Sequence, residues 1–169
     1  MAERKPRLTR EDWLTAGLVA LEEQGPGALA AEPLARALGT TKGSFYWHFK
    51  DVATFRMSVA EAWEARALAA IAAAPRDGAA TERLLALSRP DPAEAAMRGW
   101  ARRSPQLAAV VGHVDRARAT ALRDSLAGLG LTNPEFARIV QAAVIGMETL
   151  GDTAPLSTLL AAILALQDA

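Results

Sequence analysis

The chain contains no cysteine and only two histidines among its 169 residues. Without cysteine there is no disulfide scaffold, no thiolate metal site and no cysteine nucleophile. His48 and His113 alone are too few for a multi-histidine metal centre. Lys plus Arg and Asp plus Glu both number 19, so the formal net charge is zero. A uniformly basic coat for nucleic acid is therefore excluded, whereas a local basic patch is not.

Long apolar runs are also missing from the sequence. The longest, Ala67–Ala74 and Leu159–Leu166, fall far short of the ~20 residues that cross a bilayer. Residues 1–7 carry charge with no apolar run behind them, so no signal peptide is predicted. We therefore expect a cytoplasmic protein that has no membrane partner.

The residues that are present favour an all-α chain. Alanine is abundant, β-branched residues are sparse, and prolines and glycines fall between periodic segments. Thr9 and Asp12 form a capping-box pattern at the start of the first helix, and Gly39 stands where a left-handed C-cap would end the second. Helices are predicted over residues 10–24, 31–38, 40–49, 51–74, 106–126, 133–150 and 155–167, with shorter helices between the breaks at 75–78, 90–92 and 104–105.

The first three predicted helices form the most specific pattern. A supporting helix, a short helix, a glycine turn and a second short helix make a helix-turn-helix unit. In such units the second short helix enters the major groove of DNA. Here it carries small residues, which let the backbone approach the duplex, and donors suited to phosphate oxygens. The candidate DNA contacts are Thr40, Thr41, Lys42, Gly43, Ser44, Tyr46, Trp47, His48 and Lys50.

Positive charge gathers in this part of an otherwise neutral chain. Residues 39–50 contain two lysines and no acid, and residues 1–10 contain four basic side chains against one acid. These local charges lie where a DNA-binding head needs them. Arg4, Lys5 and Arg7 are therefore further candidate DNA contacts, with a tail that only aids solubility as the alternative interpretation.

The run Gly39–Asp51, GTTKGSFYWHFKD, resembles the helix-turn-helix signature of the tetracycline-repressor (TetR) family, and the resemblance spans about Thr9–Val59. It implies a homodimeric repressor that binds a palindromic operator in double-stranded DNA. The implied domains are a three-helix head, residues 1–50, and a helical domain, residues 51–169, that dimerises and binds a small effector. A long fourth helix joins the two. The chain departs from the family pattern at Ala30 and Ala31, where a hydroxyl residue often holds a phosphate.

The last predicted helix is apolar nearly all round, so it must be covered on several sides. We expect a partner copy to cover one of them, with the helix over 133–150 completing a four-helix bundle from two subunits. A monomer in which this helix is fully buried is the alternative. The predicted interface residues are Phe136, Val140, Ala143, Leu156, Leu159, Leu160, Ile163 and Leu164.

The last helix is expected to pack against the partner copy. An effector pocket is therefore predicted among the helices between Asp51 and Leu150. Small-molecule sites are mostly apolar with a few placed polar groups. A mostly apolar effector is therefore expected. The candidate lining residues are Met97, Trp100, Arg103, Val110, His113, Val114, Val144 and Met147.

The alternatives to a ligand-released repressor are a second kind of regulator and an enzyme. A DNA-binding regulator without any effector, either repressor or activator, fits the same head. An enzyme is not expected, because the sequence has no glycine-rich phosphate loop, nucleophile elbow or metal-ligand spacing. His113 and Asp115 do not make an acid–base pair, since residues two apart on a helix do not face each other. No cofactor is predicted.

Overall fold

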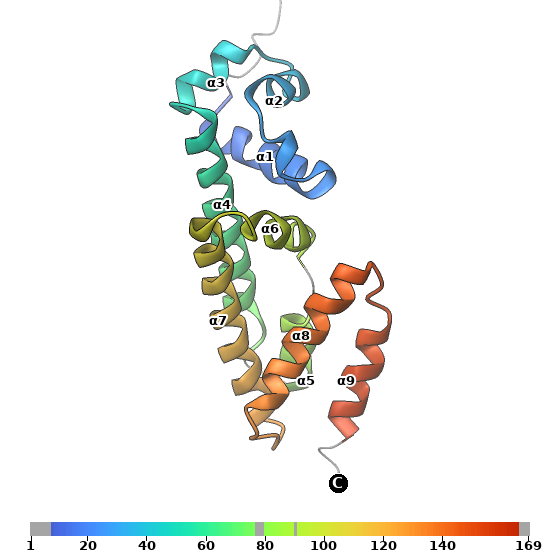
Figure 1. Ribbon diagram of the computed structural model, residues 1–169. Coiled ribbons are helices and arrows are strands. Elements are labelled where there is room, and N and C mark those ends of the chain that lie inside the picture. Colours follow the sequence, from blue (N-terminus) through green and yellow to red (C-terminus); the bar gives the residue numbers. More distant parts are fainter. Residues whose placement is uncertain (1–7, 77–79, 90, 166–169) are drawn as a thin grey trace, which may run out of the picture.

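The structure is a computed structural model that describes residues 8–76, 80–89 and 91–165. All regular structure within these ranges is helical, which confirms the predicted fold class. The N-terminal helices form a head at one end, the later helices form a bundle at the other, and α4 (Val52–Ala73) runs between them (Figure 1).

The head consists of α1 (Arg10–Gln24), the 3-10 turn η1 (Pro26–Ala28), α2 (Ala31–Ala37) and α3 (Lys42–His48). The predicted capping box is present: the Thr9 hydroxyl accepts from the Asp12 N–H, and the Asp12 carboxylate accepts from the Thr9 N–H at 2.7 Å. Gly39, between α2 and α3, has a φ of 62°. Glycine adopts this left-handed conformation without steric cost, so the chain can turn sharply there. The turn η1 is an addition to the sequence prediction.

The rest of the chain packs around one long helix. Asp51 caps the start of α4 by accepting the Thr54 N–H at 2.7 Å. The helices that follow are α5 (Ala80–Leu87), α6 (Glu94–Ala101), α7 (Pro105–Ala127), α8 (Glu135–Leu150) and α9 (Pro155–Ala165). Helix α7 lies against α4, α5, α6 and α8, and α9 packs on α8. The predicted end of the last helix at Gln167 lies outside the described residues.

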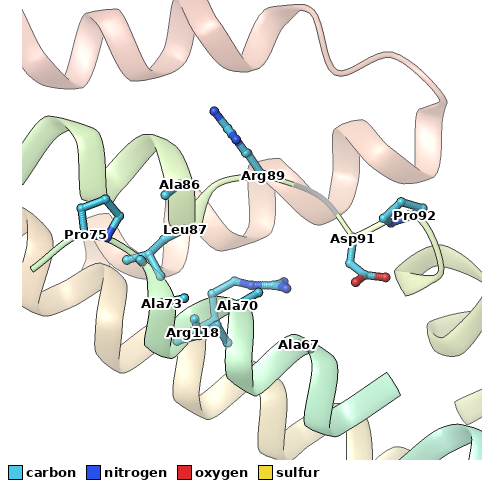
Figure 2. Close-up of a pocket in the computed structure, with 12 residues that line it drawn as sticks. Ala67, Ala70, Ala73, Pro75, Ala86, Leu87, Arg89, Asp91, Pro92 and Arg118 are labelled. Carbon is cyan, nitrogen blue, oxygen red and sulfur yellow. The ribbon is translucent and has the colours of Figure 1, made fainter. Parts of the chain in front are cut away.

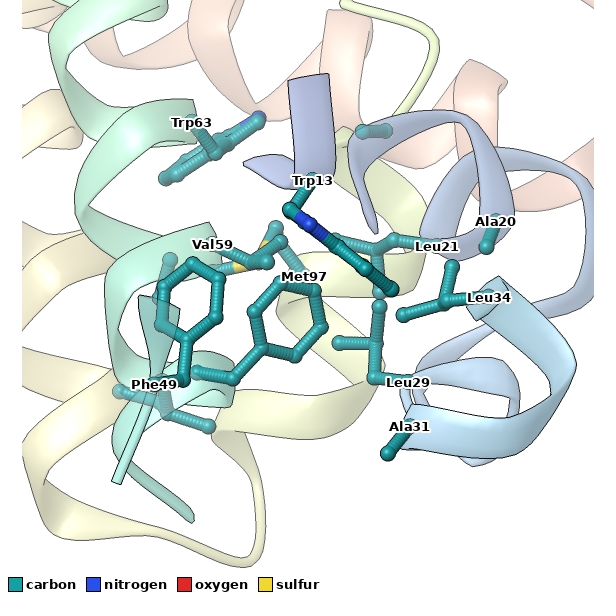
Figure 3. Close-up of a cluster of buried hydrophobic side chains, with 14 of the residues drawn as sticks. Trp13, Ala20, Leu21, Leu29, Ala31, Leu34, Phe49, Val59, Trp63 and Met97 are labelled. Atoms are coloured by element: carbon teal, nitrogen blue, oxygen red, sulfur yellow. The ribbon is translucent and has the colours of Figure 1, made fainter. Parts of the chain in front are cut away.

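Among the described residues, the first of two hydrophobic cores joins the head to α4, α6 and the start of α7. Phe45 of α3 is fully buried, with its ring edge-on to those of Trp13 and Phe55 at centroid distances of 5.4 and 5.2 Å. Ala93, which immediately precedes α6, is fully buried in the same core. Met97 is also fully buried there (Figure 3). Helix α6 is therefore part of the base on which the head rests.

The second core lies among α5, α7, α8 and α9. It holds four of the residues predicted for a subunit interface, and these are buried within their own chain: Val140, Leu156, Leu160 and Ile163. The other four are partly buried against the same core or beside it: Phe136, Ala143, Leu159 and Leu164. The α9 residues are buried because the most apolar face of α9 packs against its own chain. Among the described residues, no helix is both long and apolar enough to cross a membrane.

Candidate nucleic-acid interface

Helix α3 is held by one side chain that faces inward and by a cap at its start. Phe45 anchors it in the first core. The Thr41 hydroxyl accepts the Ser44 N–H at 3.4 Å and so satisfies one of the free donors at the start of the helix. Because Phe45 faces the core, the residues on the opposite side of this short helix face outward.

The outward face of α3 carries two large aromatic side chains in solvent. Trp47 is 79% exposed and Tyr46 is 48% exposed. An exposed tryptophan contributes nothing to this chain's own core, but its indole N–H can donate to a phosphate oxygen. Lys42 and Lys50 are also exposed, and no acid lies among residues 39–50. This outward surface, the α3 ridge, is thus cationic and rich in hydrogen-bond donors. Helix α3 itself lies at the outer end of the head (Figure 1).

The nine predicted contact residues from Thr40 to Lys50 are brought together on this ridge. Most are exposed, whereas Thr40, Ser44 and His48 are half-buried. Arg4, Lys5 and Arg7 lie outside the described residues. The structure therefore gathers the central part of the predicted site in one place.

Gly43 is left bare by the protein itself. A Cβ at this position would meet only the Thr41 hydroxyl oxygen, at 3.6 Å. The fold therefore does not require glycine here, although glycine inside a helix costs about 1 kcal/mol relative to alanine. Glycine would be required at this position if the backbone of another molecule approached it closely.

Arg10 is a functional candidate that the sequence pattern did not single out. Its Nη2 donates to the Ser58 hydroxyl at 2.7 Å, and its guanidinium lies 5.1 Å from the centre of the Phe49 ring. These contacts hold a positive charge at the junction of α1, α3 and α4. The signal in the sequence is its place directly after the helix cap at Thr9.

The residues predicted for an effector pocket are divided between the two cores. Met97 and Val114 are fully buried in the first core, with Trp100 and Val110 packed against it. Val144 is buried in the second core, and Met147 packs against that core. Arg103 and His113 are exposed, and His113 Nδ1 lies 2.6 Å from a Glu64 carboxylate oxygen.

A cavity of about 330 Å³ lies instead between α4, α5, α7 and the segment around residue 91. Its wall includes Ala67, Ala70, Ile71 and Leu87, and Arg118 of α7 reaches into it (Figure 2). None of the eight predicted pocket residues lines it. The sequence does hold a signal for Arg118, since it interrupts the apolar series Val114–Arg118–Leu122 at four-residue spacing.

Arg118 belongs to a buried polar network between α6 and α7. Glu94 is 0% exposed and Arg118 is 4% exposed, and their two ends meet in a pair of hydrogen bonds of 2.7 Å each. Arg98 also donates to Glu94, at 2.6 Å, and to Asp115. Burial raises the pKa of Glu94, but the hydrogen bonds and charges of Arg118 and Arg98 outweigh that effect and hold it below its usual value.

Glu148 of α8 lies beside this network. Burial, together with the negative charge of Glu94, raises its pKa from 4.5 to about 7. The network thus brings three carboxylates, those of Glu94, Asp115 and Glu148, near two arginines.

The comparisons with known proteins agree with the geometry of the head. Residues 14–51 match the sequence model of the bacterial regulatory proteins of the tetR family. No curated protein matches the chain. The fold is similar to that of a transcriptional regulator from Rhodococcus sp. Rha1, with a TM-score of 0.72 and 21% identity over 95% of this chain and 94% of that one.

Two further solved structures share the fold. Salmonella enterica GusR has a TM-score of 0.65 and 17% identity over 100% of both chains. A bacterial regulatory protein in the tetR family from Rhodococcus RHA1 has a TM-score of 0.57 and 18% identity over 94% of each chain. At these identities the structures show the fold, while the match over residues 14–51 carries the family. Residues 14–51 therefore match a helix-turn-helix segment of the tetR family of bacterial regulatory proteins, and the chain as a whole shares the fold of solved transcriptional regulators, one of them a tetR-family protein.

Proposed function

We propose that this protein is a cytoplasmic repressor that binds a palindromic operator as a homodimer and leaves it when a small molecule binds. In this proposal, residues 1–50 read the DNA and residues 51–169 dimerise and bind the effector. The observation that carries the DNA-binding part is the outward face of α3, with exposed Lys42, Tyr46 and Trp47 around the bare Gly43. Such a face supports entry of α3 into the major groove, with Tyr46 and Trp47 donating to flanking phosphates.

A stripe on the outer face of α8 supports the homodimer. Phe136, Ile139, Ala143, Gly146 and Leu150 recur at helical spacing with no charge among them. Ile139 is 52% exposed and Leu150 is 83% exposed. A helix face of this kind fits a second copy of itself, because a two-fold axis brings identical stripes together. This stripe replaces the buried residues of α8 and α9 as the proposed contact.

The cavity beside Arg118 favours a ligand-responsive regulator over one without an effector. Its volume of about 330 Å³ is at the lower end of the range of small-molecule sites. Its wall is mostly apolar with one buried charged group, which is the composition expected for such sites.

The DNA-binding proposal is tested with an operator recovered by genomic selection and titrated in labelled form. We expect Lys42→Ala and Tyr46→Ala each to weaken binding by about 1–3 kcal/mol, and Lys42→Ala to reduce the salt dependence. Gly43→Ala is expected to weaken binding while leaving the unfolding temperature unchanged or raised, since the fold has room for the methyl group. Arg123→Ala, exposed on α7 far from the head, is the control. Wild-type affinity in the Lys42→Ala, Tyr46→Ala double variant would refute this use of α3.

The dimer is tested by light scattering at micromolar concentration. We expect a mass near twice the 17.9 kDa of one chain, and a mass near 17.9 kDa for Ile139→Glu, which places a charge in the stripe. Ala69→Glu adds the same charge on the exposed side of α4 and is expected to leave the dimer intact. A wild-type chain that remains at 17.9 kDa contradicts the homodimer.

A further inference from the structure

The cavity between α4, α5 and α7 has one buried cation in an apolar wall. Ala67, Ala70, Ile71 and Leu87 supply the apolar surface, and Arg118 extends into the space (Figure 2). Arg89 also lines the cavity, but its side chain is exposed and points away from Arg118 in this view. A molecule in the cavity would therefore meet carbon on most sides and the Arg118 guanidinium at one point.

The guanidinium of Arg118 has more N–H donors than its hydrogen bonds to Glu94 use. An arginine has five N–H groups. In the part of the chain that the structure describes, the hydrogen bonds of Arg118 use two of them, both to Glu94. The nearby acid Asp91 is already engaged: its Oδ1 accepts from Trp63, from Arg66 and from the Ala93 N–H. Asp91 therefore neither binds Arg118 nor presents an unpaired negative charge to the cavity.

Glu94 connects this cation to the base of the head. Glu94 lies in the first turn of α6, next to Ala93 and three residues before Met97, which are both fully buried in the core of the head. Helix α6 also packs against α1 and η1. A displacement of Glu94 therefore moves a helix that packs against the head, where Met97 lies in the first core (Figure 3).

We propose that the cavity binds a small organic anion, with an apolar body against the alanine-rich wall and a carboxylate on Arg118, and that this carboxylate competes with Glu94. The inference rests on the proposed function as a ligand-released regulator and assigns the chemical class of the effector and the path of its signal. When Arg118 turns to the anion, Glu94 loses both hydrogen bonds from Arg118 and is left with Arg98, which also binds Asp115. The loss of one of its two charged partners is strongly unfavourable for a buried carboxylate, so α6 shifts until Glu94 is solvated or pairs with another cation. The anion thereby favours the state in which the head is displaced, as any effector that changes DNA affinity must.

The experiment uses the full chain, its selected operator and a fixed set of probes. The probes are hexanoate, octanoate, decanoate and 3-phenylpropanoate, each paired with its neutral primary amide. Calorimetry measures binding to the protein, and titration of labelled operator measures release. We expect at least one carboxylate to bind wild type tenfold more tightly than its amide and to lower operator affinity at least tenfold.

Two variants separate the role of Arg118 from simple loss of fold. The double variant Glu94→Met, Arg118→Met removes the pair together and leaves Arg98 with Asp115, an exchange that buried pairs often tolerate. We expect it to bind operator within threefold of wild type, to bind each acid no better than its amide, and to show no release. Glu94→Gln alone leaves Arg118 without a carboxylate, and we expect it to lower operator affinity at least tenfold with no probe present. Arg89→Met is the lining control and should respond like wild type.

The outcomes distinguish this inference from the proposed function. A wild-type chain that binds no operator refutes the proposed function itself. If the chain binds operator and every acid binds no better than its amide, the assigned ligand class is wrong. If an acid releases both wild type and the double variant, the path through Arg118 and Glu94 is wrong.

Discussion

Gly17 sets how closely α1 approaches α4, so its replacement by alanine is expected to loosen the head. A Cβ at this position would lie 2.7 Å from Val59 Cγ2 and 2.8 Å from Phe55 Cζ. Carbon atoms in good contact are about 3.5–4.0 Å apart, so both contacts are strongly repulsive. Phe55 and Val59 are fully buried, and the surrounding core leaves them little space to move. Helix α1 must therefore shift away from α4.

The magnitude follows from two opposing effects. Alanine is favoured over glycine in a helix by about 1 kcal/mol. Overpacking a filled core costs about 1–3 kcal/mol, and two contacts below 3.0 Å place this site in the upper part of that range. The expected net loss for Gly17→Ala is about 1–2 kcal/mol, which is a fall of about 2–8 °C in unfolding temperature for a chain of this size. Gly99→Ala on α6, where a Cβ meets nothing within 4 Å, is expected to gain up to about 1 kcal/mol.

Urea unfolding, followed by circular dichroism, measures the stability of both variants. Operator titration, at a temperature where each variant is folded, measures how well the head binds DNA. Gly17→Ala should also weaken operator binding, because the position of α3 depends on how α1 packs against α4 and on the core that the three helices share. If Gly17→Ala proves as stable as Gly99→Ala, the close approach of the two helices does not limit the packing and the reasoning fails.

Three smaller predictions concern the body of the protein. The pKa of Glu148 is raised from 4.5 to about 7, so the folded state holds this proton more tightly and stability falls as pH rises through that window. Because the side chain is partly exposed, we expect a loss of about 1–2 kcal/mol between pH 4.5 and 8 that is absent in Glu148→Gln; equal pH profiles from urea unfolding would contradict it. Met97→Ala should cost about 2–5 kcal/mol in the same assay, whereas Leu85→Ala, largely exposed, should change little. Ser104→Ala removes the hydroxyl that accepts the Leu107 N–H at the start of α7, and thermal unfolding should show a loss of about 1 kcal/mol.

The sequence predicts the helices and the head well because their signals are local. A cap, a glycine with positive φ and a proline each act within a few residues, so the bounds of α1 follow from Thr9 and Gly25 without knowledge of the rest of the fold. The outward face of α3 is also predictable, because a seven-residue helix anchored by Phe45 can turn only one side to the core.

The faces of α8 and α9 are harder to predict because they depend on packing between distant segments. Helix α9 is apolar nearly all round, so periodicity cannot say which side covers the chain and which is free. The structure turns Leu156, Leu160 and Ile163 inward and leaves Ile139 and Leu150 of α8 outside. The sequence does not predict the cavity, for a related reason. The cavity lies where small alanines of α4 face Arg118 across a gap, and such a gap leaves no periodic pattern in the sequence.

The position of the polar network between the two cores explains why it can carry a signal. On α7, Val114 belongs to the first core, Leu122 to the second, and Arg118 lies between them at four-residue spacing. Hydrophobic contacts have no preferred direction, whereas a buried ion pair such as Glu94–Arg118 is satisfied in few arrangements. The pair therefore fixes α6 against α7 at the level where the base of the head meets the bundle. Disturbing the pair therefore changes the position of one core relative to the other. A ligand that fills apolar space within one core has no comparable effect on the other core.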